Sequence, residues 1–93
     1  MRLYELTTVY PLEEDQYQAG RDQVLADLAA QGVEIVKTGD PIDRDLAYEV
    51  QKRRRARYVL YNLNIEPEKI TLLDRSFKLN ANLLKYLFVR VEQ

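Results

Sequence analysis

The 93-residue chain contains no cysteine, no histidine and no tryptophan, and it has only three glycines and three prolines. Without cysteine it can form no disulfide, no thiolate zinc site and no cysteine nucleophile. Without histidine it lacks the commonest general base and the commonest transition-metal ligand. Most hydrolytic triads and zinc enzymes are therefore excluded, and we expect no catalytic residue, no metal site and no cofactor.

Long apolar runs are also absent from the sequence. No stretch approaches the ~18 apolar residues that a transmembrane helix needs, and the first residues lack the hydrophobic segment of a signal peptide. Hydrophobic residues make up 46% of the chain and charged residues 31%, which is the balance of a soluble globular protein. These features predict a single cytoplasmic domain that spans residues 1–93.

The charge is unevenly distributed, although the formal net charge is only −1. Residues 1–51 carry four basic and eleven acidic side chains, whereas residues 52–57 (Lys-Arg-Arg-Arg-Ala-Arg) carry five basic side chains and no acid. Crowding like charges costs self-repulsion, and arginine makes paired contacts with phosphate. The basic run therefore predicts contact with a polyanion; the alternative is a solvated turn of long polar side chains. The residues predicted to bind RNA on this ground are Lys52, Arg53, Arg54, Arg55 and Arg57.

The first part of the chain predicts a strand followed by a helix. Residues 3–10 are β-branched and aromatic, which is typical of a strand, and Pro11 ends it. Apolar side chains then recur every three or four positions to about Gln31, and Gly32 suits a left-handed residue after the helix end. Gly20 lies inside this helix at a cost of about 1 kcal/mol relative to alanine, so we expect another element to approach closely there.

The middle of the chain predicts a β-hairpin. A second strand opens at 33–36, is interrupted by a bulge or loop at 39–41, and resumes at 46–50. A third strand covers 57–65. The basic residues at 52–56 are predicted to form the turn between these strands, so the positive charge would lie at the hairpin tip.

The last part of the chain predicts a second helix and a closing strand. The helix begins near Pro67 and ends at Asn80 and Asn82, and the strand covers 83–91. The order β-α-β-β-α-β predicts the α+β class and a ferredoxin-like βαββαβ fold, a four-stranded antiparallel sheet with two helices on one face. The other sheet face is left open, so it must be polar or bind something.

A search for reactive groups favours no enzyme. The acids Asp40, Asp43 and Asp45 lack the glycine and the bidentate glutamate of a calcium-binding loop, so a solvated loop is favoured over a metal site. Ser76 is the only serine and has no histidine to activate it. Only carboxylate or tyrosine chemistry stays open. Of the seven tyrosines we expect most in the core and one or two exposed.

Four blocks of sequence, at 2–6, 44–52, 57–61 and 84–90, resemble the bacterial small-subunit ribosomal protein S6 family. The first is similar to that family's opening Arg-x-Tyr-Glu, and the second to its Arg-x-Leu-Ala-Tyr-Pro-Ile-x-Lys. The other two resemble its third and closing strands. The blocks occur in the family's order and cover nearly the whole chain. Glu49 stands where the family usually has proline, and the turn that follows is more basic than usual.

The resemblance implies a non-enzymatic ribosomal component, located with the ribosome in the cytoplasm. It implies binding to the central domain of small-subunit rRNA together with ribosomal protein S18. Because the acidic first half opposes a polyanion, we expect a basic partner to be required. By position, the RNA-facing residues would be Arg2, Tyr4, Lys52, Lys85 and Arg90, and the partner protein would contact Leu46, Ala47 and Tyr48.

An alternative function needs no RNA. A ferredoxin-like protein-interaction or small-ligand module would have the same order of strands and helices, and its basic turn would only be solvated. Such a module would be expected to self-associate through its open sheet face or an edge strand, because unpaired backbone groups of an edge strand can pair with another chain.

Overall fold

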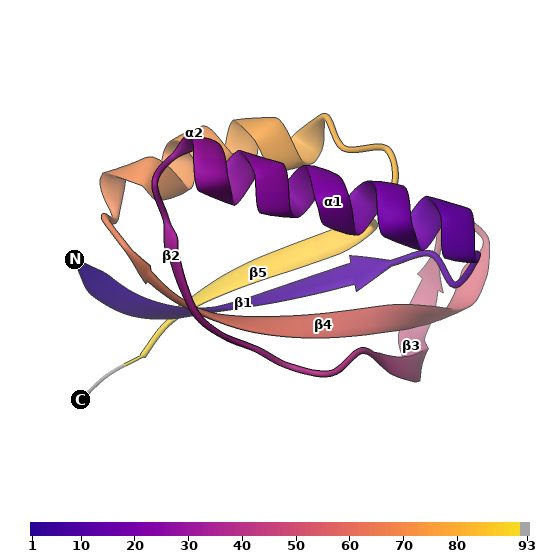
Figure 1. Ribbon diagram of the computed structural model, residues 1–93. Coiled ribbons are helices and arrows are strands. Elements are labelled where there is room, and N and C mark those ends of the chain that lie inside the picture. The colour runs from indigo at the N-terminus through magenta and orange to yellow at the C-terminus, as the bar shows by residue number, and fades with distance from the viewer. Residues whose placement is uncertain (92–93) are drawn as a thin grey trace.

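The computed structural model describes residues 1–91, in which two helices cover one face of a twisted antiparallel sheet (Figure 1). The elements are β1 (Arg2–Tyr10), α1 (Glu14–Ala30), β2 (Glu34–Thr38), β3 (Ile42–Val50), β4 (Arg53–Ile65), α2 (Glu68–Lys78) and β5 (Lys85–Arg90). The predicted ferredoxin-like α+β fold is confirmed. No helix of residues 1–91 is long and apolar enough to cross a membrane.

The sheet has five strands where the sequence predicted four. β1 lies between β4 and β5, and the other edge of β4 pairs with β2 and then with β3. β2 and β3 are the two parts of the predicted second strand, separated around Gly39 and Pro41. The Gly39 N–H still donates to the carbonyl of Leu60 on β4 at 2.7 Å, and the break follows at Pro41, because proline lacks the N–H that a strand needs.

The turn between β3 and β4 is shorter than predicted. It consists of Gln51 and Lys52, whose φ angles of 49° and 63° suit a two-residue hairpin turn. The prediction of a basic turn at 52–56 is therefore wrong: from Arg53 onward these residues form the start of β4. The strand extends because Arg55 lies opposite Asp45 on β3, and opposite charges across strands favour pairing.

The core lies between the sheet and the helices. It contains Leu6, Tyr10, Tyr17, Val24, Leu28, Val59, Tyr61, Leu63, Ile65, Leu73, Phe77 and Leu83. Alternate residues of β1 and β4 enter it because successive strand side chains point to opposite faces. The Tyr10 and Tyr61 hydroxyls lie 3.4 Å apart in this core, where burial raises the pKa of both phenols. Tyr48, by contrast, is 66% exposed, as expected for one or two of the tyrosines.

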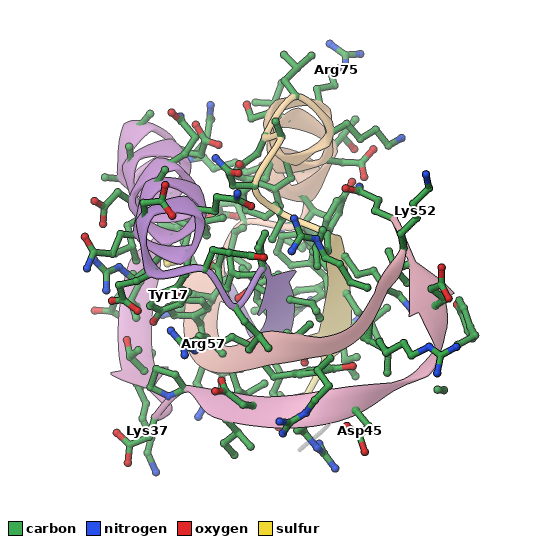
Figure 2. The ribbon with its side chains drawn as sticks, turned by 90° about the vertical axis from the view of Figure 1, so that its right-hand side faces the viewer. Tyr17, Lys37, Asp45, Lys52, Arg57 and Arg75 are labelled. Atoms are coloured by element: carbon green, nitrogen blue, oxygen red, sulfur yellow. The ribbon has the colours of Figure 1, made fainter. Side chains whose placement is uncertain are left out.

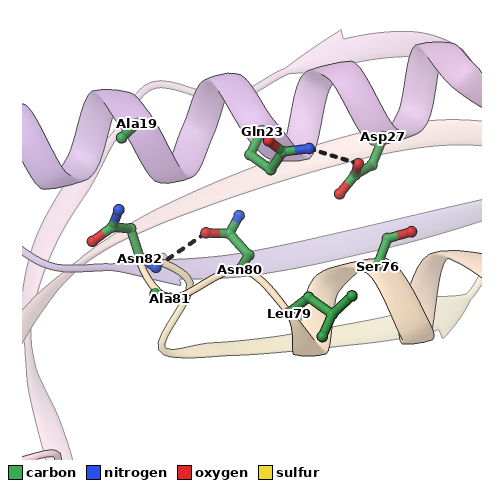
Figure 3. A pocket seen from close by; sticks show the side chains of 8 residues that line it. All are labelled: Ala19, Gln23, Asp27, Ser76, Leu79, Asn80, Ala81 and Asn82. Carbon is green, nitrogen blue, oxygen red and sulfur yellow. Dashed lines mark hydrogen bonds between the residues drawn. The ribbon is translucent and has the colours of Figure 1, made fainter.

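The end of α1 and its contact with the segment before β5 agree with the sequence. Gly32 has a φ of 66°, the left-handed conformation predicted after the helix. Figure 3 shows Asn80 and Asn82 facing α1 across an open groove of about 490 Å³. The Asn80 amide donates to the carbonyl of Gly20 at 3.1 Å. A β-carbon placed on Gly20 would overlap the carbonyl of Asn82, so the predicted close approach is confirmed.

Replacing Gly20 with alanine is expected to destabilise the fold. Helix propensity alone would stabilise the G20A variant by about 1 kcal/mol, but overpacking against a neighbouring backbone costs about 1–3 kcal/mol. We expect a net loss of about 1 kcal/mol in urea unfolding. The matched control is A26G at an exposed position of α1, which should lose about 1 kcal/mol through propensity alone. A stabilised G20A variant would contradict the close approach.

Candidate nucleic-acid and partner interface

The residues predicted to face RNA lie in two groups at opposite ends of the sheet. Tyr4 pairs with Arg90 at one end, and Val9 pairs with Lys85 at the other. The five residue steps along β1 from Tyr4 to Val9 span about 17 Å. The strand-end group consists of Arg2, Tyr4 and Arg90. The hairpin group consists of Lys52, Arg53, Arg54, Arg55, Arg57 and Lys85.

The strand-end group combines exposed charge with one structural side chain. Arg2 and Arg90 are exposed. Tyr4 is half-buried and packs against the core. Its row across the sheet also contains Leu63 of β4, a fully buried residue. The two arginines therefore present positive charge at this end, while Tyr4 holds their strands against the core.

Arg57 of β4, in the hairpin group, is held by contacts from two other elements. Its Nε donates to Asp43 of β3 at 2.8 Å, and its Nη1 donates to Glu14 of α1 at 3.0 Å. Its guanidinium carbon lies 4.7 Å from the centre of the Tyr17 ring (Figure 2). Only 20% of the side chain is exposed. The hydrogen bond to Asp43 raises the pKa of Arg57 above its usual value, so the side chain stays charged. Through these contacts Arg57 connects β3, β4 and α1.

Arg53, four residues earlier in β4, makes similar contacts with the start of α1. Its Nη1 lies 2.7 Å from a carboxylate oxygen of Glu13, and its Nη2 donates to Gln16 at 3.1 Å. Hydrogen bonds from its own backbone and from Arg53 hold the pKa of Glu13 below its usual value. Arg53, next to the hairpin turn, and Arg57, four residues further along β4, thus bind the β3–β4 hairpin to the start of α1.

The other cations of the hairpin are more accessible. Arg54 is 89% exposed and its Nε is 3.8 Å from Glu49, while the Arg55 Nε is 3.0 Å from Asp45. Exposed ion pairs of this kind contribute about 0–1 kcal/mol, so a phosphate can replace the carboxylate at little cost. Lys52 projects from the turn (Figure 2), and within residues 1–91 no carboxylate lies within 4 Å of its Nζ.

Intramolecular acids thus surround the basic run. The carboxylates that contact it are Glu13, Glu14, Asp43, Asp45 and Glu49. Sequence reasoning missed the pairs with Glu13 and Glu14 because they join distant segments: Glu14 and Arg57 are 43 residues apart. The predicted polyanion site is therefore locally balanced in charge. Among residues 1–91 no cluster of three or more acidic residues is arranged to hold a metal ion.

The predicted RNA and partner residues meet beside the hairpin. The Lys85 Nζ lies 3.1 Å from the Tyr48 hydroxyl and 4.7 Å from the centre of its ring. Leu46, Ala47 and Tyr48 line an open depression of about 630 Å³ whose other walls include Arg54 and Arg55. Leu46 is half-buried, and the next two residues are exposed. The structure therefore joins two sets of residues, predicted separately, into one continuous surface.

Comparison with known proteins identifies the family of this chain. The family model for ribosomal protein S6 matches residues 3–90. The small ribosomal subunit protein bS6 of Treponema denticola is 52% identical over 93 residues and covers 99% of each chain. That of Treponema pallidum (strain Nichols) is 38% identical over 92 residues, again covering 99% of each. The chain belongs to the ribosomal protein S6 family. The resemblance drawn from the four sequence blocks is confirmed, and the relatives in this family are proteins of the small ribosomal subunit.

Solved structures support the fold of this S6 family member. The 30S ribosomal protein S6 from Thermotoga maritima matches with a TM-score of 0.85 at 16% identity, covering 97% of this chain and 87% of that one. The C-terminal domain of the MgtC protein from Mycobacterium tuberculosis matches with a TM-score of 0.62 at 8% identity, covering 100% of this chain and 90% of that one. At such identities the likeness shows the fold alone, which proteins of different function share.

The ties between the hairpin and α1 predict a loss of stability in acid. Hydrogen bonds from Gln18 and then Arg57 hold the pKa of Glu14 below its ordinary 4.5, and a hydrogen bond from Arg57 holds the pKa of Asp43 below its ordinary 3.8. Below those ordinary values the unfolded chain therefore binds more protons than the folded chain. The stabilisation is complete above about pH 5 and is lost as the pH falls through the lowered values.

The test is urea unfolding of the wild type and R57Q at pH 7 and pH 3. R57Q should have a lower midpoint at pH 7 and should lose less on acidification than the wild type. R75Q, which changes an exposed arginine on α2, should keep the full pH dependence. An equal acid-induced loss in R57Q and the wild type would show that Arg57 does not stabilise these carboxylates.

Proposed function

We propose that this protein is a structural constituent of the small ribosomal subunit in the bacterial cytoplasm, where it binds the central domain of small-subunit rRNA together with ribosomal protein S18. The observation that carries the proposal is the contact between Lys85 and Tyr48. It joins the expected RNA surface to the expected partner surface, on a chain of the S6 family. The role is one of binding and assembly, without catalysis.

The exposed cations are the proposed RNA contacts. Lys52, Arg54 and Arg55 present their charge around the hairpin end, and Lys85 lies beside them. Folded RNA offers side chains mainly phosphates and 2′-hydroxyls, because its deep major groove is too narrow to read. Point charges on a protruding hairpin suit such backbone contacts. The strand-end arginines would reach a second stretch of the RNA backbone.

Arg53 and Arg57 have a different proposed role from the one the sequence predicted. Their guanidinium groups are engaged by the start of α1, so a phosphate would have to displace several hydrogen bonds, of which the one from Arg53 to Gln16 is partly buried. We assign them to positioning the hairpin. Since the acids balance the basic run, affinity for RNA from this chain alone should be low, and a basic partner would add the missing positive charge.

The expected outcome is a change in the salt dependence of RNA binding. In the presence of S18, the R54A/R55A variant should bind a central-domain rRNA fragment about tenfold more weakly at low salt. The slope of log affinity against log salt should flatten by between about 1 and 2, because each phosphate contact releases counterions. Filter binding between about 50 and 200 mM salt measures both quantities.

The matched control removes two charges elsewhere. R75A/K78A changes two exposed cations on α2, away from the hairpin, and should leave affinity and slope within error of the wild type. An unchanged slope in R54A/R55A would remove the hairpin from the RNA interface. Loss of RNA binding by the wild type itself, with S18 present, would overturn the proposed function.

A further inference from the structure

The sheet face turned away from the helices carries an apolar patch around one carboxylate. Residues opposite each other in antiparallel strands share a face, so the register defines rows across β4, β1 and β5. Two neighbouring rows on this face are Leu60, Thr7 and Leu87, and Asn62, Glu5 and Val89. Leu60, Leu87 and Val89 are all exposed, as is Val36 on β2. A contiguous apolar surface of this kind marks an interaction site more often than chance exposure does.

Glu5 at the centre of this patch forms no ion pair with the described residues, although Lys37 of the edge strand β2 lies in the same row, opposite Asn62 of β4. Within residues 1–91 no lysine or arginine nitrogen lies within 4 Å of its carboxylate, in contrast to the five acids around the hairpin. Glu5 lines a depression of about 210 Å³ together with the apolar residues Leu3, Val36 and Val91 and the amide of Asn62. Apolar walls with a carboxylate at one side fit a lysine or arginine, whose aliphatic stem packs on apolar surface while its charge meets the acid.

We infer that the open sheet face is the docking surface of a basic partner protein, and that the depression beside Glu5 receives a lysine or arginine side chain of that partner. The inference rests on the proposed function, which supplies the partner. It adds a surface and a contact residue that the Leu46–Tyr48 segment did not include. The patch is continuous with that segment, because Lys85 lies on the same face opposite Val9 and touches Tyr48.

Other occupants fit this face less well. RNA would bring phosphates to the unpaired Glu5 in the middle of the face, because the cations Lys37 and Lys85 lie on the edge strands β2 and β5. The aromatic side chain available for stacking on this face, Tyr58, is half-buried beneath Arg44. A second copy of the chain would place the same patch against itself and bring two Glu5 carboxylates together. A protein that presents a cation among apolar side chains can pair with the Glu5 carboxylate and cover the apolar side chains around it.

Calorimetric titration with S18 tests the inference. We expect L60S to weaken S18 binding about tenfold, as truncation at the centre of an interface does. E5Q should weaken it several-fold and reduce its salt dependence, and E5K should weaken it further through repulsion. The matched controls are L72S, at an α2 side chain 43% exposed where Leu60 is 41% exposed, and E68Q at the exposed start of α2. Both should bind as the wild type does.

The outcomes separate this inference from the proposed function. Wild-type affinity in L60S, E5Q and E5K would overturn the inference and leave the function standing. If S18 binds no form of the chain while the rRNA fragment still binds, the inference falls and the RNA role remains. Weaker rRNA binding by the variants without S18 would make the face an RNA contact instead. A wild-type dimer that L60S dissociates in sedimentation would assign the open sheet face to a second copy of the chain.

Thermal melting checks that each variant is folded, and L87S replaces L60S if the latter unfolds.

Discussion

The pairing of β4 with three other strands is the constraint on which the rest of the structure depends. β1 lies along one edge of β4, and β2 and β3 follow each other along the opposite edge. Because side chains alternate along a strand, this one segment supplies the core through residues such as Tyr61 and the open face through residues such as Leu60. Its first half carries the arginines that reach α1. A break in β4 would therefore disturb the core, the hairpin and both surfaces together.

The arginines of β4 show that charge in a sequence and charge on a surface are different quantities. Five cations in six positions predict a strongly positive site, but folding brings carboxylates from α1 and β3 to four of them. The pairs differ in exposure, and this decides what each can do. Arg57, enclosed by Asp43, Glu14 and Tyr17, stabilises the fold, whereas the Arg54 charge lies in water and exchanges partners at low cost.

Local pattern accounts for what the sequence predicted well. Short segments of sequence predicted the alternation of side chains along the strands, the end of α1 before Gly32, the start of α2 near Pro67 and the break around Gly39. These local features were enough to predict the fold. The turn at Gln51–Lys52 was misplaced because nothing local signals that a run of arginines continues a strand; the reason lies in Asp45 across the hairpin. The ion pairs and the unpaired Glu5 depend on contacts between distant segments, which composition and periodicity do not contain.

The two surfaces differ in the physics of binding, and this bears on how they would work together. Phosphate contacts at the hairpin would weaken steeply with salt, whereas the apolar part of the open face would be nearly insensitive to it. A partner held mainly by apolar contact can stay bound at salt concentrations that weaken the RNA contacts, and its own cations would then add to those of Lys52 and Lys85. Lys85 lies on the same sheet face as Glu5 and contacts Tyr48 of the hairpin, so the two surfaces adjoin each other. A basic partner docked on the open face would therefore place its cations next to those of the hairpin, and in this way an almost neutral chain can contribute to a complex with a polyanion.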